Sequence, residues 1–409
     1  MNSDTLILKE LGCQLAEIAS LPIQEEKKKL WRANNSLRPL RPMVFIEQLP
    51  WHELNDCEEL TLKCEDEFLR EIEQGIRRTL YKWHHFPADM VVENQISIPK
   101  TINGLHYGLR IKEEIIALDS ANSVVSHKYI DQCESEEALA ALSSDQVQID
   151  KELDNQRLAS LKDIFQGIIP VRLSGIMANC AVWDRISKAR PAEAIMYDIA
   201  DRPEFVLKIA EKFRDLTLST LEQCEELGLL DVELPTANAT IVYTDDLPPL
   251  GYDPLHPKAS DCWSFGMAQI FSTVGPDTHE ELEIDIMKPL YERFGLINYG
   301  CCEPLEKKIH LIRKIRNVRK ISVSPWAKID ESAEQMGRDY VFSGKAHPSF
   351  VASGQLDKEN VIKQTEQMIQ SCRRSNTPCE IVLKDISTVS YRPKTLSEWE
   401  KAVMQLAQA

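Results

Sequence analysis

The stretch Leu296-Ile297-Asn298-Tyr299-Gly300-Cys301-Cys302-Glu303-Pro304 decides the predicted fold. Its beginning, directly after Gly295, has the apolar character of a short buried strand. Pro304 suits the first position of a helix, which we expect to run to about Ile315. A strand followed so soon by a helix forms one βα unit.

Three more units of this kind follow along the chain. Each joins a short apolar segment to a segment whose apolar residues recur at helical spacing. Repeated βα alternation with short connections predicts an α/β protein with a parallel sheet, and four units in one half of the chain predict a (β/α)8 TIM barrel. The expected strands are 318–324, 340–343 and 380–383, and the expected helices are 330–337, 357–373 and 396–407.

The first half of the chain is compatible with the same barrel. Its clearest helix is expected over 204–227, with one apolar stripe. A second helix, near 276–294, should kink or break at Pro289. Residues 1–40 are predicted to form an N-terminal helical extension, and residues 41–409 the TIM-barrel catalytic domain. The strand candidates of this half are 43–47, 90–93, 168–173 and 230–234.

The composition is that of a globular protein. Of 409 residues, 43% are hydrophobic and 27% charged, which excludes disordered and collagen-like chains. The net charge of 48 − 64 = −16 repels nucleic acids and anionic lipids, so we expect neither as a partner. No apolar window approaches about 18 residues and no signal-like segment begins the chain, so neither a membrane span nor secretion is expected. Eleven cysteines in such a chain indicate reduced thiols and a cytoplasmic protein.

Candidate catalytic residues follow from the barrel, because its active sites lie where strands end and loops begin. Thiols and carboxylates at such positions suit a borderline-soft cation such as zinc. The plain alternative is that Cys301 and Cys302 are two small buried residues. No dinucleotide, Walker, His-Glu-x-x-His or Gly-x-Ser-x-Gly motif competes. The strand-end positions hold Glu47, Glu93, Glu233, Cys301-Cys302-Glu303, Ser324-Pro325-Trp326, Lys345-Ala346-His347-Pro348 and Lys384-Asp385.

At these strand ends the sequence resembles the uroporphyrinogen decarboxylase superfamily, and within it a methyltransferase-like, corrinoid-dependent branch of anaerobes. The decarboxylases grip porphyrinogen carboxylates with an Arg-Gln-Ala-Gly-Arg segment after the first strand. Here residues 46–53 read Ile-Glu-Gln-Leu-Pro-Trp-His-Glu, and an acidic loop cannot pair with a polycarboxylate. The resemblance therefore implies methyl transfer. It runs from about Arg41 to the end and rests on 296–304, 321–326, 344–348 and 380–388.

The methyltransferases of this superfamily bind zinc, and one of their ligand patterns is a His-x-Cys at the end of a strand plus a later Cys. In this chain Tyr299 stands in the position of the His and Cys301 in the position of the Cys. Asp385 falls near the position of the last ligand. The chain therefore departs from this pattern.

A second pattern, that of the O-demethylase methyltransferases, is an acidic residue, about 27 residues, a Cys, about 39 residues and a Cys. Cys262 and Cys302 enclose 302 − 262 − 1 = 39 residues. Glu233 leaves 262 − 233 − 1 = 28 residues before Cys262, and Asp231 is its possible substitute. The resemblance implies zinc on Glu233, Cys262 and Cys302, with Cys301 as a further candidate ligand.

The function that follows is transfer of a methyl group from an aryl methyl ether to the cobalt of a corrinoid protein. Zinc would polarise the ether oxygen, and the corrinoid protein would cap the barrel mouth. One alternative is a zinc-free methyltransferase for a quaternary amine, caged by Glu47, Glu93 and Trp residues. Another alternative is a related barrel with a different activity or with none. The presence of Tyr299 in the position of the ligand His favours this alternative. The candidate catalytic or positioning residues are Glu47, His52, Trp326, Lys345 and Asp385.

Overall fold

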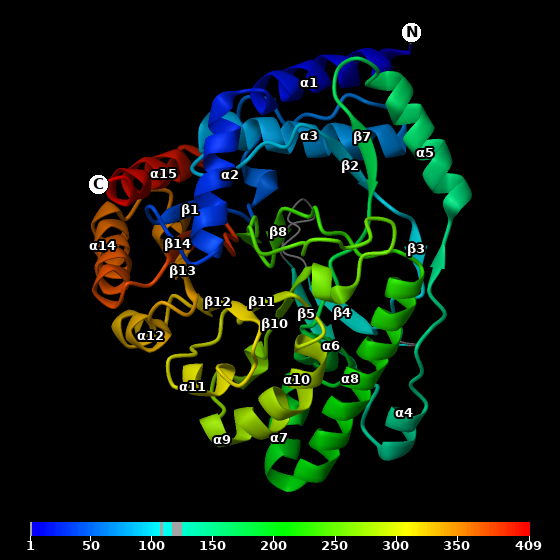
Figure 1. The fold of residues 1–409 in the computed structure, drawn as a ribbon, viewed down its shortest axis with the longest axis vertical. Helices are drawn as coiled ribbons and strands as arrows, with labels where there is room; N and C mark the ends of the chain where they lie inside the picture. Colours follow the sequence, from blue (N-terminus) through cyan, green and yellow to red (C-terminus); the bar gives the residue numbers. More distant parts are fainter. Residues whose placement is uncertain (1, 107–108, 117–124) are drawn as a thin grey trace.

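The computed structural model describes residues 2–106, 109–116 and 125–409 of the chain. Its centre is a parallel sheet of six strands in the order β1-β14-β13-β12-β11-β10 (Figure 1). The chain is therefore an α/β protein with a parallel sheet, as predicted. The six strands are β1 (Met43–Ile46), β10 (Trp263–Gly266), β11 (Leu296–Tyr299), β12 (Val318–Val323), β13 (Val341–Ala346) and β14 (Cys379–Leu383).

The burial of these strands explains why they form a parallel sheet. Every residue of β1, β11, β13 and β14 is buried, as expected for strands that are covered on both faces. The register pairs Met43 with Glu380 and Trp263 with Leu296, so the strand starts lie along one edge. The loops that follow the strands therefore leave from the opposite, carboxyl edge.

The predicted closed barrel is only partly found. Strands β2 (Ile96–Pro99) and β7 (Val171–Ser174) form a separate parallel pair. Single parallel bridges, Asn179 to Phe265 and Ile176 to Leu230, link the segment after β7 to its neighbours. Among the described residues the ladders do not close into one ring of eight strands.

A short hairpin fills the space that the strands surround. It consists of β8 (Thr236–Ala237) and β9 (Thr240–Ile241), and β8 lies near the middle of Figure 1. The Asn298 side chain donates to the Ala237 carbonyl at 3.2 Å, and Lys320 donates to the Ile241 carbonyl at 2.7 Å. The hairpin therefore replaces the layered apolar side chains of an ordinary barrel interior.

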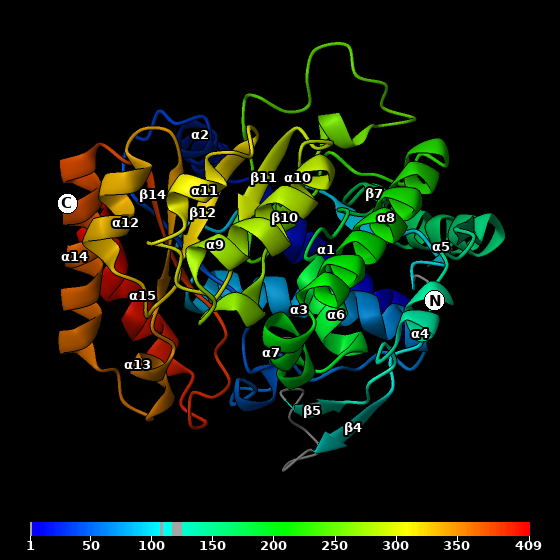
Figure 2. The same cartoon turned by 90° about the horizontal axis from the view of Figure 1, so that it is seen from below.

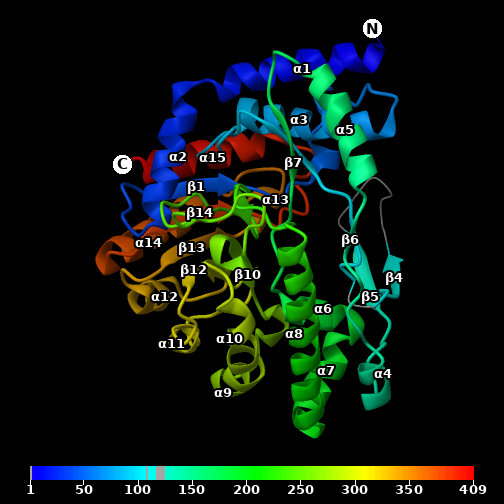
Figure 3. The same ribbon diagram turned by 45° about the vertical axis from the view of Figure 1, so that its right-hand side comes forward.

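The predicted helices around the sheet are present with small shifts at their ends. The Asp357 carboxylate caps α14 by accepting from the Asn360 backbone N–H, which stabilises the helix start. Helix α8 packs beside α6, α7 and α10 on the outside (Figure 3). These helices are α8 (Pro203–Glu226), α12 (Ile329–Met336), α14 (Lys358–Ser375) and α15 (Lys394–Ala407).

The amino-terminal helices share one core with α3, α5 and several strand residues. The Trp31 indole donates to the Asp89 carbonyl at 2.8 Å, and Asn35 donates to the Ile241 carbonyl at 3.0 Å. Helix α2 thus lies against the amino ends of the strands. These helices are α1 (Ser3–Ala19), α2 (Pro22–Asn35), α3 (Glu67–His85) and α5 (Lys151–Ile164).

Of two further strands predicted in the first half, 90–93 is absent and 230–234 is reduced to a single bridge at Leu230. The Asp89 N–H still bonds to the Val44 carbonyl at 3.0 Å, but the Val92 N–H bonds to the Gln24 side chain, so 90–93 leaves the sheet. In 230–234 the backbone pairing is limited to the bridge between Leu230 and Ile176, where the Asp231 N–H donates to the Ile176 carbonyl at 3.1 Å. The Asp231 carboxylate in addition accepts from the Gly175 N–H at 2.9 Å.

Two predicted helices are shorter or less regular than expected. The segment 304–315 holds only α11 (Ile309–Ile312). The segment 276–294 divides into α9 (Pro276–His279), a π-helical turn (Glu280–Ile284) and α10 (Asp285–Tyr291), with Pro289 inside α10. Helix α10 continues through Pro289 to Tyr291, so the predicted break does not fall at this residue, and the irregular turn lies upstream at 280–284.

The remaining elements are short. Figure 2 shows α2 near one face of the molecule and β4, β5 and α13 near the opposite face. No helix of the described residues is both long and apolar enough to cross a lipid bilayer. These elements are β3 (Ile102–Asn103), β4 (Glu113–Ile116), β5 (Ser126–Tyr129), β6 (Gln148–Ile149), α4 (Glu136–Ala140), α6 (Val182–Ala189), α7 (Ala192–Asp201), α13 (Ser349–Ala352) and the 3-10 turns Trp51–Glu53, Ala259–Asp261 and Gln269–Phe271.

Candidate active site

The two adjacent cysteines lie at the carboxyl end of β11. Gly300 turns the chain there with φ +88, and a side chain on it would meet Leu305 Cδ1 at 2.5 Å. The Ser322 hydroxyl donates to the Cys301 carbonyl at 2.8 Å. With the turn held in this way, the Sγ atoms of Cys301 and Cys302 lie 3.5 Å apart.

Glu303 fastens this turn to the neighbouring strand end. Its carboxylate accepts from the backbone N–H of Cys301 at 2.9 Å and from that of Ala268 at 3.2 Å. Glu303 is fully buried, and burial raises its pKa to about 7. The side chain therefore serves to position the cysteines, since both of its oxygens are occupied by backbone groups.

The two residues that directly follow β14 supply the charges that face the cysteines. Lys384 Nζ lies 2.9 Å from Cys301 Sγ and 3.1 Å from Asp385 Oδ2. Cys302 Sγ donates to the same carboxylate oxygen at 3.3 Å. We call Cys301, Cys302, Lys384 and Asp385 the thiol cluster.

The thiol cluster shifts the pKa values of its own members. The hydrogen bond from Cys302 and the charge of Lys384 lower the pKa of Cys301 to about 6, although burial opposes this. The pKa of Cys302 is raised, because its hydrogen bond with Cys301, its burial and the charge of Cys301 all disfavour its thiolate. Burial alone would lower the pKa of Lys384, but the charges of both cysteines and Asp385 raise it. The lowered pKa of Cys301 and the raised pKa of Lys384 both favour a thiolate–ammonium pair in the cluster.

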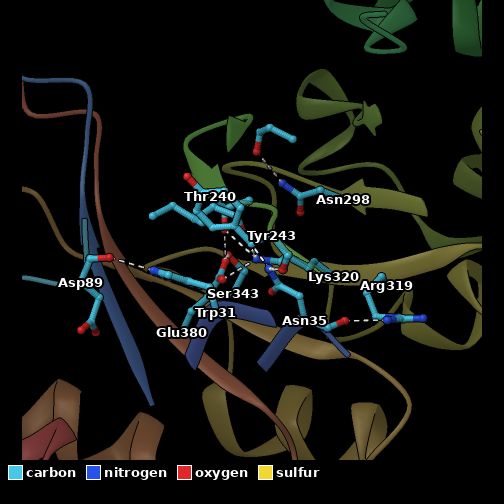
Figure 4. Close-up of polar contacts among 12 residues, drawn as sticks. Trp31, Asn35, Asp89, Thr240, Tyr243, Asn298, Arg319, Lys320, Ser343 and Glu380 are labelled. Atoms are coloured by element: carbon cyan, nitrogen blue, oxygen red, sulfur yellow. Dashed lines mark hydrogen bonds and ion pairs between the residues drawn. The ribbon is translucent and has the colours of Figure 1, made fainter. Parts of the chain in front are cut away.

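Further polar groups lie deeper between the strands. Lys345 Nζ donates to the Ser343 hydroxyl at 2.7 Å, and burial lowers the pKa of Lys345 to about 8. Lys320 and Glu380 form an ion pair at 2.6 Å, and the hydroxyls of Thr240 and Ser343 donate to Glu380 (Figure 4). Lys345, one of the predicted positioning residues, is thus buried between the strands and does not lie at the open carboxyl edge of the sheet.

Glu47 and His52, two other predicted positioning residues, lie in the loop after β1. Glu47 pairs with Lys82 at 2.8 Å. His52 packs edge-on against Tyr391, with ring centroids 6.3 Å apart. The neighbouring Glu53 carboxylate accepts the backbone N–H of Tyr391 at 3.1 Å, so this loop braces the loop that follows β14.

Trp326 is another of the candidate positioning residues predicted from the sequence. It is 62% exposed and stands edge-on to His347, with centroids 5.6 Å apart. It therefore forms part of the exposed rim of the carboxyl edge. Asp385, which belongs to the thiol cluster, is the predicted catalytic residue whose position fits the prediction most closely.

The predicted zinc ligands do not come together. Cys262 immediately precedes β10, beside Gly295 at the start of β11, whereas Cys302 follows the end of β11. Glu233 pairs with Arg172 at 3.2 Å and lines a cavity of about 370 Å³. The pairing of Cys262 with Cys302 was therefore wrong, because the two thiols lie at opposite ends of the parallel strands.

The remaining donors do not form a metal site either. The described residues contain no group of three or more His, Cys, Asp or Glu side chains with the geometry of a metal site. The Lys384 ammonium group contacts both Cys301 and Asp385. A metal cation bound to the same atoms would therefore be repelled by the positive charge of Lys384. A metal ion does not fit the thiol cluster while Lys384 holds this position.

Tyr299, which replaces the expected His, points toward the outer helices. Its hydroxyl lies 3.0 Å from His279 Nε2 and donates to Glu283 Oε1 at 3.2 Å. Tyr291 also donates to Glu283 at 2.5 Å. Burial lowers the pKa of His279 to about 3 and raises that of Glu283 to about 8. Tyr299 is thus part of an internal hydrogen-bonded network, which also includes Lys308, whose Nζ lies 3.4 Å from His279 Nδ1. The identity of Tyr299 says nothing against activity at the thiol cluster.

The sequence does not reveal the part that Lys384 plays in the site. Lys384 is predicted only as a strand-end position, although its spacing from Glu380 places both on one face of a strand.

Comparison with known proteins adds information on the fold. No family model and no curated protein matches the chain. Among solved structures, it is similar to a methyltransferase from Methanosarcina mazei, with a TM-score of 0.51 and 10% sequence identity. The likeness covers 92% of this chain and 98% of that chain. At this identity, the likeness establishes a shared fold.

Proposed function

We propose that this chain, which shares its fold with a methyltransferase, moves a methyl group from an O-methylated donor such as an aryl methyl ether. The proposed acceptor is the cobalt of a corrinoid carried by a separate protein, which supplies a strong nucleophile. The fold likeness and the resemblance at the strand ends both support methyl transfer. The choice of an oxygen leaving group comes from the thiol cluster.

The observation that carries the proposal is the position of Lys384. An ether is inert because its oxygen leaves with negative charge, which must be stabilised in the transition state. Lys384 has three N–H donors, and its contacts among the described residues are with Cys301 and Asp385. One donor remains for a leaving oxygen, so the ammonium group can do at this position what zinc was expected to do.

The mouth is less suited to a quaternary amine. The two carboxylates expected to cage a cation are already paired, Glu47 with Lys82 and Glu93 with Lys28, each at 2.8 Å. Glu93 also lines the same cavity as Glu233, away from the cysteines. An ammonium group on the protein repels a cationic substrate, whereas it attracts developing negative charge.

Zinc-dependent ether cleavage is the second candidate. Its supporting observation is the closeness of three possible ligand atoms in the thiol cluster. The Sγ atoms of Cys301 and Cys302 lie 3.5 Å apart, and Cys302 Sγ lies 3.3 Å from Asp385 Oδ2. Bound zinc would require Lys384 to leave its present contacts. Zinc analysis of the purified protein distinguishes the two candidates, since only this one requires about one zinc per chain.

The test is an anaerobic assay of methyl transfer from a methoxybenzoate to cob(I)alamin, followed by the cob(I)alamin absorption band. We expect Lys384→Met to lower kcat by roughly 10²–10³-fold, as for the loss of one preorganised donor. Lys328→Met is the matched control, because the Lys328 side chain is exposed and its ion pair among the described residues is with Glu331. An unchanged rate in Lys384→Met would refute the role of the ammonium group. Turnover of tetramethylammonium but of no methoxybenzoate would refute the substrate class.

A further inference from the structure

Cys301 and Cys302 can do chemistry that methyl transfer does not use. Their Sγ atoms are 3.5 Å apart, and Cys302 is partly exposed whereas Cys301 is buried. A disulfide has an S–S distance of about 2.05 Å, so closure requires an approach of about 1.5 Å. The two residues stand in a loop after β11 and take no part in a helix or a strand. The loop can therefore shift without breaking a ladder.

The surroundings favour a reactive sulfur at Cys301. The Lys384 ammonium group, 2.9 Å away, stabilises the thiolate, which is the nucleophilic form of cysteine. Cys302 is held beside it through the bond to Asp385 at 3.3 Å. We propose that Cys301 and Cys302 form a vicinal dithiol whose substrate is a small hydroperoxide such as hydrogen peroxide. This proposal does not depend on the proposed methyl transfer.

The reaction has two steps. The Cys301 thiolate attacks one peroxide oxygen, the O–O bond breaks, and hydroxide leaves with the electron pair and is protonated to water. The resulting sulfenic acid is then attacked by the sulfur of Cys302, which forms the S–S bond and releases a second water. Two thiols are oxidised by two electrons, and one peroxide is reduced to two waters.

The product should be easily reduced. A disulfide between adjacent residues closes a small strained ring, and strained disulfides have the higher potentials of labile bonds. Oxidation would also remove the thiolate that contacts Lys384. The pair would therefore report peroxide reversibly, with dithiothreitol restoring both thiols.

Other cysteines of the chain serve as controls for the reactivity of Cys301 and Cys302. Cys372 and Cys379 interact with each other but are 2% and 3% exposed in the core. Cys57 is exposed, and the charge of Asp56 raises its pKa, which makes it less reactive. If proximity or exposure alone decided reactivity, one of these sets would oxidise as readily as the thiol cluster.

The experiment treats the full chain with about one equivalent of hydrogen peroxide, blocks the remaining thiols with N-ethylmaleimide, and digests with trypsin. The peptide 294–307 contains Cys301 and Cys302 and no other cysteine. We expect this peptide to lose two hydrogens first, to escape alkylation, and to recover after dithiothreitol. Earlier oxidation of Cys57 or of the Cys372–Cys379 pair would overturn the proposal.

Two variants test the assignment within the cluster. Cys302→Ser should leave Cys301 as a sulfenic acid that dimedone labels, because the resolving thiol is gone. Lys384→Met should slow oxidation of 294–307 at least about tenfold, since less thiolate is present. Oxidation at the wild-type rate in Lys384→Met, or no dimedone label in Cys302→Ser, would contradict the proposed roles.

Discussion

Strand β14 carries an ionisable side chain near each of its ends, and the two lie in different surroundings. Near the amino end, Glu380 pairs with Lys320 at 2.6 Å, and both side chains are completely buried. Near the carboxyl end, Lys384 contacts Cys301 at 2.9 Å and Asp385 at 3.1 Å, and the Asp385 side chain is 47% exposed. The first pair is enclosed, whereas the second joins a buried lysine, 2% exposed, to a half-exposed carboxylate at the carboxyl edge.

The difference separates a structural ion pair from a candidate catalytic one. Lys320 donates to Glu380, to the Thr240 hydroxyl and to the Ile241 carbonyl, which uses all three of its N–H groups. It ties the internal hairpin to the sheet and has no donor left. Lys384 keeps one donor for a ligand, and it lies where the strands of an α/β protein place their active sites.

The largest expected effect is on the enclosed pair. Lys320→Met should lower the free energy of unfolding by about 3–5 kcal/mol, because it leaves the Glu380 carboxylate buried without its partner. Urea denaturation of the purified variant measures this loss. A loss below about 1 kcal/mol would show that the pair does not stabilise the interior.

The open pair should behave in the opposite way. We expect Lys384→Met to remove most of the proposed methyl transfer but to reduce the unfolding free energy by only about 1–2 kcal/mol, because Cys301 can take up a proton and become neutral. Urea denaturation beside Lys320→Met makes the comparison direct. Equal destabilisation by the two substitutions would remove the distinction between the pairs.

The buried network of Glu283, Tyr291 and Tyr299 predicts that the stability of the protein depends on pH. Burial raises the pKa of Glu283 from 4.5 to about 8, so between these values the folded state binds more protons than the unfolded state. Stability is then full below about pH 4.5 and declines as the pH rises through about 8. Glu283→Gln should flatten this part of the profile of Tm against pH. An identical profile for the variant and the wild type would contradict the raised pKa.

The smallest effect is expected at the amino end of β10. Cys262 lies in the core, so Cys262→Ala should cost about 1–2 kcal/mol of stability and leave methyl transfer unchanged. Cys301→Ala, at the other end of the neighbouring strand, should by contrast remove the thiolate partner of Lys384. Loss of methyl transfer in a folded Cys262→Ala variant would show that this thiol takes part in the site after all.

The carboxyl-terminal half of the fold was predictable because its strands are short, apolar and buried on both faces. Strand β10 was missed because Trp-Ser-Phe-Gly mixes polar and apolar residues, and Gly266 is required where the Tyr291 ring packs against it. Because β10 was not predicted, the sequence did not show whether Cys262 lies at the amino or the carboxyl end of a strand. The spacing of 39 residues between Cys262 and Cys302 therefore suggested a contact that the parallel register forbids.

The site itself was predictable only in part. A strand end marks Cys301, Cys302 and Asp385 as candidates, since topology alone gathers such residues at one edge. The contact between Lys384 and Cys301 depends on how two separate strand ends are staggered, and a sequence does not specify this. The pairing of Glu47 with Lys82 likewise depends on where α3 packs.

The most direct test of the account is the methyl-transfer rate of one sample before and after exhaustive treatment with a strong chelator, with its zinc content measured in parallel. If Lys384 supplies the positive charge at the leaving oxygen, as we propose, turnover of a methoxybenzoate should persist unchanged at negligible zinc. Loss of activity on chelation, and its recovery with about one equivalent of zinc, would contradict it.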